Sequence, residues 1–102
     1  MATAQHTSLE QRFRTLVREW KHATSHLSSV TERSMHRAYQ QIIGLGPAAT
    51  PLILRELERE PDDWFWALAA ITGENPIPQD AAGKLGEMRA AWLHWGAEHG
   101  YL

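Results

Sequence analysis

The chain has 102 residues, 43% of them hydrophobic and 22% charged, which is the composition of one globular domain rather than of a disordered segment. It contains no cysteine, so disulfides and thiolate metal sites are excluded and a reducing cytoplasm is the expected compartment. Residues 1–6 lack the pattern of a signal peptide, and the apolar runs are too short to span a bilayer. Five tryptophans are many for this length, and their rings can supply much of a small core.

Charge is unevenly distributed along the chain, although the net charge is only −2. Residues 1–46 carry six basic and three acidic groups, whereas residues 47–102 carry four basic and nine acidic groups. A chain with two oppositely charged halves can steer an anionic partner to one end, or it can associate head to tail.

The first predicted helix covers residues 8–26 and follows a flexible tail at residues 1–6, so residues 7–102 are expected to form one helical domain. Thr7 and Glu10 match a capping box, in which both side chains satisfy backbone N–H groups at the start of a helix. Apolar residues recur every three or four positions behind it, which predicts one buried stripe. Its basic residues fall mostly outside that stripe: Arg12, Arg14, Arg18 and Lys21.

The second predicted helix begins after another capping box, formed by Ser29 and Glu32. Ser34 is an alternative cap, so the start of this helix stays open. Apolar residues continue at helical spacing to Ile43. The helix is expected to end at residues 44–46, Gly-Leu-Gly, because glycine readily adopts the left-handed conformation found after helix ends.

The third predicted helix begins near one of two prolines, which both suit the first turn of a helix because they lack an N–H group. Either a short turn at residues 47–49 precedes a helix that starts at Thr50, or one helix starts at Pro47 and carries Pro51 in its first turns. Pro61 closes the helix, since the residue before a proline disfavours the helical conformation.

The fourth predicted helix covers residues 62–71 and has eight consecutive apolar residues after Asp63. A helix that is apolar on every side is normally buried, so we expect it at the centre of the fold. Trp64 and Trp66 point to opposite sides of this helix, so one interface cannot bury both rings. Burial of Trp66 between two helix layers is favoured, and partial exposure as a binding anchor is the alternative.

The last predicted helix covers about residues 83–99, after a proline-containing loop, and Gly100 is its expected C-cap. Trp92 and Trp95 lie on its apolar stripe. Tyr101 and the final leucine either fold back on the core or lie free. Because no strand pattern occurs, the chain is predicted to be all-α, a compact array of about five helices.

Residues 43–57, which read IGLGPAATPLILREL, resemble the first helix of a HEAT-type repeat. In that family a helix follows a Gly-Pro-Ala-Ala turn and bends at a proline a few residues on. Residues 63–71 sit where the second helix of the repeat would lie, which makes a central HEAT-like αα-hairpin. With the tail around Trp92 to Trp95, the resemblance to some small bacterial proteins covers about residues 38–99. The chain contains one candidate repeat rather than an array. The resemblance implies a protein-binding scaffold and transfers no site residues.

Few residues are arranged for catalysis or metal binding. His22 and His26 are one helical turn apart, which is a metal-binding spacing, but two solvent-facing histidines are the favoured interpretation because no HExxH or ExxH pattern accompanies them. Glu60, Asp62 and Asp63 are explained by the preference of carboxylates for a helix N-terminus. No serine lies in a nucleophile motif. We therefore predict no enzyme, no metal and no cofactor.

The sequence predicts a non-enzymatic protein-interaction module in the cytoplasm, whose partner is the product of a neighbouring gene, as in antitoxin or immunity pairs. The alternative is a small nucleic-acid-binding regulator that uses the basic side of the first helix. Self-association stays open, and no membrane partner is expected. The candidate partner-binding residues are Arg14, Arg18, Lys21, Trp66, Trp95 and Tyr101.

Overall fold

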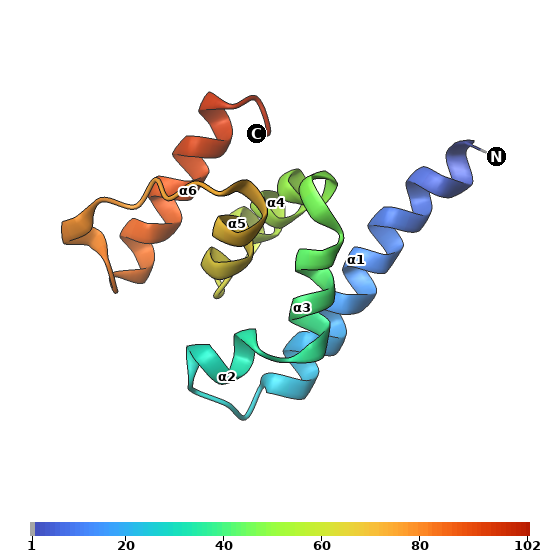
Figure 1. Cartoon of the computed structure of the whole chain (residues 1–102), viewed down its shortest axis with the longest axis horizontal. Helices are drawn as coiled ribbons and strands as arrows, with labels where there is room; N and C mark the ends of the chain where they lie inside the picture. The colour runs from blue at the N-terminus through green and yellow to red at the C-terminus, as the bar shows by residue number, and fades with distance from the viewer. Residues whose placement is uncertain (1) are drawn as a thin grey trace.

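The computed structural model describes residues 2–102, with side chains from Ser8 onward, and the chain over these residues is all-α without strands (Figure 1). Its helices are α1 (Ala2–Thr24), α2 (Val30–Ser34), α3 (Arg37–Gly44), α4 (Thr50–Arg59), α5 (Phe65–Thr72) and α6 (Leu85–Glu98), with the 3-10 turns η1 (Gly46–Ala49) and η2 (Gln79–Ala81).

The helices are spread along an axis of 47 Å, and the other two dimensions are 34 and 22 Å. Helices α1 and α3 pack against each other near one end, and α6 with the loop before it lies at the other end (Figure 1). Helices α4 and α5 connect the two ends, because α5 contacts α3 and α4 contacts α6.

Helix α1 begins earlier than the capping box predicts. The helix includes Ala2, so the backbone of the expected tail is helical from that residue, and Met1 lies outside the described residues. Residues 2–6 contain no proline or glycine that would stop a helix. The predicted apolar stripe is confirmed further along, because Phe13, Val17 and Trp20 are buried.

The prediction of a single second helix, whose start the sequence left open between caps at Ser29 and Ser34, is wrong, because the chain forms α2 and α3 with a break between them and Ser34 is the last residue of α2. The cap at Ser29 is confirmed, since its hydroxyl accepts a hydrogen bond from Glu32 N at 3.2 Å. A second cap follows at His36, whose Nδ1 accepts from Ala38 N at 3.0 Å. At the break, the carbonyl of Arg33 accepts a hydrogen bond from Trp20 Nε1 at 2.7 Å as well as one from His36 N at 3.3 Å, so a tertiary contact accompanies the loss of helical continuity.

The predicted ends of the middle helices are confirmed. Gly46 has a φ of 79° and Gly73 a φ of 73°, which are left-handed conformations that glycine adopts without steric cost. A short 3-10 turn precedes α4, so the first of the two alternatives for this segment holds, with Pro51 in the first turn of α4. The chain becomes extended at Glu60, before Pro61.

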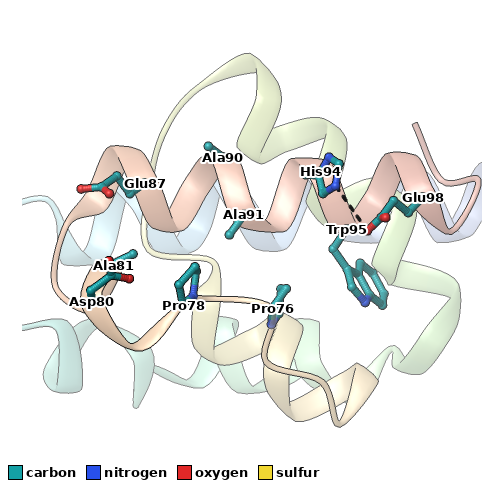
Figure 2. A pocket seen from close by; sticks show the side chains of 10 residues that line it. All are labelled: Pro76, Pro78, Asp80, Ala81, Glu87, Ala90, Ala91, His94, Trp95 and Glu98. Carbon is teal, nitrogen blue, oxygen red and sulfur yellow. Dashed lines mark ion pairs between the residues drawn. The ribbon is translucent and has the colours of Figure 1, made fainter.

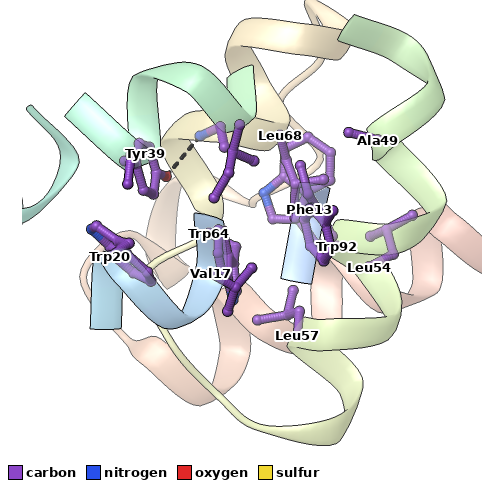
Figure 3. Close-up of a cluster of buried hydrophobic side chains, with 14 of the residues drawn as sticks. Phe13, Val17, Trp20, Tyr39, Ala49, Leu54, Leu57, Trp64, Leu68 and Trp92 are labelled. Atoms are coloured by element: carbon purple, nitrogen blue, oxygen red, sulfur yellow. Dashed lines mark hydrogen bonds between the residues drawn. The ribbon is translucent and has the colours of Figure 1, made fainter. Parts of the chain in front are cut away.

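The core is an aromatic cluster around Trp64, which is fully buried (Figure 3). Its ring centroid lies 4.8 Å from Trp20, 5.8 Å from Tyr39 and 6.3 Å from Phe13. The hydroxyl of Tyr39 donates to Asp63 O at 3.0 Å and accepts from the Ala67 N–H at 2.9 Å, so α3 satisfies a backbone group in the first turn of α5. The start of α5 therefore joins α1 and α3.

Burial of α5 on all sides, the favoured interpretation of its sequence, is wrong. Ala67 and Leu68 are fully buried, but Trp66 is 44% exposed and Ala70 is also exposed. Helices α3 and α4 cover two sides of α5, and the side that holds Trp66 faces solvent. The alternative interpretation of Trp66, partial exposure, holds.

The end of the chain folds back on α6. Gly100, with a φ of 77°, and the following residue close a Schellman turn, in which Tyr101 N donates to Gly96 O at 2.8 Å and Gly100 N donates to Ala97 O at 3.2 Å. The ring of Tyr101 stacks on Trp95, with centroids 5.7 Å apart. The C-cap predicted at Gly100 is thus confirmed.

Candidate functional site

A groove of about 530 Å³ lies between α1 and α4, and we call it the arginine groove. Its floor is apolar and consists of Phe13, Val17 and Leu52. Charged side chains form the rest of the lining: Arg14, Arg18, Arg55, Arg59, Glu10 and Glu56. Four arginines against two glutamates leave a formal excess of two positive charges.

Helical spacing brings the four arginines to this groove. Arg14 and Arg18 are one turn apart on α1, and Arg55 and Arg59 are one turn apart on α4, so each helix presents a pair of guanidinium groups on one side. Arg14 is largely solvent-exposed and its guanidinium lies 4.0 Å from the Glu10 carboxylate, a loose contact. The groove therefore offers exposed cations above an apolar floor.

Arg59 is held by a glutamate of the same helix. Its Nη2 lies 2.7 Å from Glu56 Oε2, and this hydrogen bond raises the pKa of the guanidinium above its ordinary value. The pair is exposed on the arginine side, so water and salt weaken it.

The basic side predicted for the first helix is divided by the structure. Lys21 Nζ lies 2.8 Å from Glu60 Oε1 and 3.3 Å from Glu56 Oε2, so this lysine is already engaged by α4 and the residue after it. The same hydrogen bond lowers the pKa of Glu60. Arg12 lines a separate hollow of about 280 Å³ with Gln41. Only Arg14 and Arg18 of the predicted basic set line the arginine groove.

The predicted aromatic residues lie away from the arginine groove. Trp66 projects from α5 and lines neither this groove nor the one beside α6. Trp95 is only 9% exposed, and Tyr101, which stacks on it, is 36% exposed. Trp95 lines a second groove, between α6 and the loop that precedes it (Figure 2). The structure thus divides the predicted partner-binding residues among separate surfaces.

The carboxylates at the start of α5 have an electrostatic role that the sequence pattern does not predict. Arg33 Nη1 lies 2.6 Å from Asp63 Oδ2, and its Nη2 lies 2.8 Å from Asp62 Oδ1. Burial raises the pKa of Asp63, although the guanidinium of Arg33 acts in the opposite direction. About thirty residues separate the partners, so no local spacing rule could have indicated this pair. Arg55 and Arg59 were missed for a similar reason, since only the packing of α4 beside α1 brings them to the groove.

Within the described part of the chain, no group of three or more histidine, aspartate, glutamate or cysteine residues is placed to hold a metal ion. His22 and His26 are both exposed on or just after α1. Over the same residues, no helix has the length and apolar character needed to cross a membrane.

Comparisons with known proteins do not assign the chain to a group: no family model matches it, and no curated protein or solved structure is significantly similar.

Proposed function

We propose that this protein is a non-enzymatic protein-interaction module, and that its arginine groove receives an acidic, partly apolar segment of a partner protein. The observation that carries this proposal is the combination of an apolar floor with two pairs of arginines on facing helices. The floor favours burial of an apolar side chain, and guanidinium groups bind carboxylates through two parallel hydrogen bonds.

The lining charges favour an acidic protein segment over a nucleic-acid backbone. Glu10 and Glu56 line the groove together with the arginines, and they would repel a continuous row of phosphates. Lys21 is engaged in internal ion pairs, and Arg12 lines a different hollow. A ligand with apolar side chains and separated carboxylates fits this pattern better than a uniformly charged one.

The resemblance of the α4–α5 hairpin to a HEAT-type repeat also supports the proposal. Helix α4 corresponds to the first helix of the proposed repeat, and it forms one wall of the arginine groove. Units of that family are mainly protein-binding scaffolds. The product of a neighbouring gene, of the antitoxin or immunity kind, is the first partner to examine.

The test uses two probes and two charge-reversal variants. The probes are a fluorescent helical peptide with leucines on one side and glutamates on both flanks, and a DNA duplex of the same net charge. The first variant, Arg14→Glu with Arg18→Glu, reverses the sign of the excess charge in the arginine groove. The matched control, Arg12→Glu with Arg37→Glu, makes the same charge change at exposed positions outside it.

We expect the peptide to bind the wild type and the control, and to lose at least tenfold in affinity for the groove variant, as expected when two charge-assisted contacts are removed. Equal losses in both variants would show that only net charge matters. Duplex binding that is tighter than peptide binding would favour the nucleic-acid alternative and would contradict the proposal. The product of each adjacent gene is then tested against the same two variants.

A further inference from the structure

A second groove, of about 580 Å³, lies between α6 and the loop at residues 73–84 (Figure 2). These segments are at the other end of the molecule from α1 (Figure 1). Pro76 and Pro78 form its loop side, and Ala90 and Ala91 lie on its helix side. The prolines restrict the loop backbone, and the alanines leave room close to the helix. Trp95 adds an aromatic surface near Pro76.

The charged side chains along this groove carry one sign. Asp80 comes from the loop, and Glu87 and Glu98 come from the two ends of α6, whereas no lysine or arginine belongs to the lining. We call this surface the acidic groove. It differs from a chance cluster of acids because the carboxylates border an apolar trough rather than one another, and the arginine groove has the opposite excess charge.

The basic side chains that contact these carboxylates are weakly held. Lys84 Nζ lies 3.7 Å from Glu87 Oε2, and both side chains are more than 60% exposed. His94 Nε2 lies 3.5 Å from Glu98 Oε1, again with both side chains mostly in solvent. Such exposed pairs contribute little free energy, so a ligand cation can replace them.

The length of the groove indicates the form of its ligand. Glu87 and Glu98 are eleven residues apart on α6, which is about 16 Å at ~1.5 Å per residue. Side chains four residues apart lie on the same side of an extended peptide and are about 13 Å apart at ~3.3 Å per residue, and two long cationic side chains span the remainder. The two glutamates are too far apart to share one metal ion, so cations on a chain fit the spacing better than a single ion does.

We propose that the acidic groove binds an extended segment of a partner protein that carries two arginine or lysine side chains four residues apart. The cations of the segment pair with Glu87 and Glu98, while its small or apolar residues lie on Ala90, Ala91 and Trp95. Asp80 lies on the loop side at the Glu87 end of the groove, so it faces the cation that pairs with Glu87. This interaction does not depend on the arginine groove.

The probe is a five-residue peptide with arginine at both ends and alanine and proline between them, titrated into ¹⁵N-labelled full-length protein. We expect saturable shifts of the Trp95 indole and of the Ala90 and Ala91 amide signals, with a Kd on the order of 1 mM. A peptide with glutamate at both ends is the charge control, and it should leave these signals unchanged. Shifts that map to another surface, or that are equal for the two peptides, would refute the proposal.

Two double variants distinguish binding in the acidic groove from a general effect of net charge. Glu87→Gln with Glu98→Gln should weaken binding about tenfold, the combined effect expected of two surface ion pairs. Glu58→Gln with Glu74→Gln removes two exposed carboxylates outside the groove, and it should bind like the wild type. Equal weakening in both would contradict the proposal. The variant Arg14→Glu with Arg18→Glu should also bind the peptide normally, so failure here is distinguishable from failure of the proposed function.

Sedimentation of the unliganded protein tests the other occupant of the acidic groove, a second copy of the chain. We expect no association that depends on Glu87 and Glu98. Salt-sensitive self-association that is abolished in the Glu87→Gln, Glu98→Gln variant would assign the groove to a second copy and would overturn the peptide assignment.

Discussion

The guanidinium of Arg33 lies 2.6 Å from the carboxylate of Asp63, and this ion pair fastens α2 to the start of α5. The same guanidinium pairs with Asp62 at 2.8 Å and lies 4.7 Å from the centre of the Trp20 ring. Trp20 Nε1 in turn donates to the carbonyl of Arg33. One residue of a five-residue helix therefore connects α1, α2 and α5 beside the aromatic core.

Replacing Arg33 with alanine should lower the free energy of unfolding by about 2 kcal/mol. The variant leaves two half-buried carboxylates without their cation, and this costs less than the 3–5 kcal/mol typical of a fully buried pair because water reaches both groups. Urea denaturation measures the change. Arg37→Ala, at an exposed position, should stay within about 0.5 kcal/mol of the wild type, and an equal loss in both variants would contradict the role given to Arg33.

Asp63 and Glu60 should respond to pH in opposite directions. The pKa of Glu60 is lowered by its hydrogen bond from Lys21, so this pair stabilises the fold above the ordinary pKa of 4.5 and loses that effect as the pH falls through the lowered value. Burial raises the pKa of Asp63 above 3.8, so protonation of this group favours the folded state as the pH falls.

Carboxyl carbon shifts of the folded protein, followed by NMR between pH 7 and about pH 2, measure both values directly. We expect Glu60 to titrate below, and Asp63 above, the same residue types in the urea-unfolded chain. Lys21→Met should return Glu60 toward its ordinary value while leaving Asp63 displaced. A normal titration of Glu60 in the wild type would show that the Lys21 contact does not persist in solution.

Two glycines of α6 should differ in their tolerance of alanine. A Cβ at Gly96 would lie 2.9 Å from Leu54 Cδ1 and 3.2 Å from Leu102 Cδ1, whereas a Cβ at Gly86 would meet nothing within 4 Å among the described residues beyond the adjacent backbone of its own helix. Leu54 is fully buried and has little room to move. We expect Gly96→Ala to destabilise the protein by about 1 kcal/mol, since overpacking outweighs the gain in helix propensity.

Gly86→Ala is the matched control and should stabilise the protein by about 0.5 kcal/mol through helix propensity alone. Thermal unfolding of the two variants measures both signs. If Gly96→Ala stabilises the protein as much as Gly86→Ala does, Leu54 and Leu102 do not pack closely against Gly96.

Two tryptophans that are two residues apart should contribute very differently to stability. Trp64→Ala should cost about 3–5 kcal/mol, because it leaves a cavity between Trp20, Tyr39 and Phe13. Trp66→Ala should cost less than about 1 kcal/mol, since its ring is 44% exposed. Chemical denaturation gives both values, and iodide quenching should fall in the Trp66 variant because an accessible ring is removed. A large loss of stability in Trp66→Ala would place that ring in the core.

The sequence by itself determined the helical class and most helix ends. The cap at Ser29 and the left-handed glycines at 46, 73 and 100 could be predicted because capping depends on a few adjacent residues and on backbone sterics. The apolar stripe of α1 could also be predicted, since burial of one side of a helix requires apolar residues at a fixed spacing. Half of the arginines in the arginine groove, Arg14 and Arg18, were also among the predicted binding residues.

Only the tertiary structure decided which neighbours each helix has. The apolar sequence of α5 could not show that two helices cover it and that the third side exposes Trp66. The break between α2 and α3 accompanies a hydrogen bond that Trp20 donates to the carbonyl of Arg33. Lys21 does not belong to the free basic side of α1, because it pairs with α4 and the residue after it. Both grooves likewise depend on segments far apart in the sequence. Contacts between segments so far apart in the sequence follow from helix packing, which the spacing of neighbouring residues does not encode.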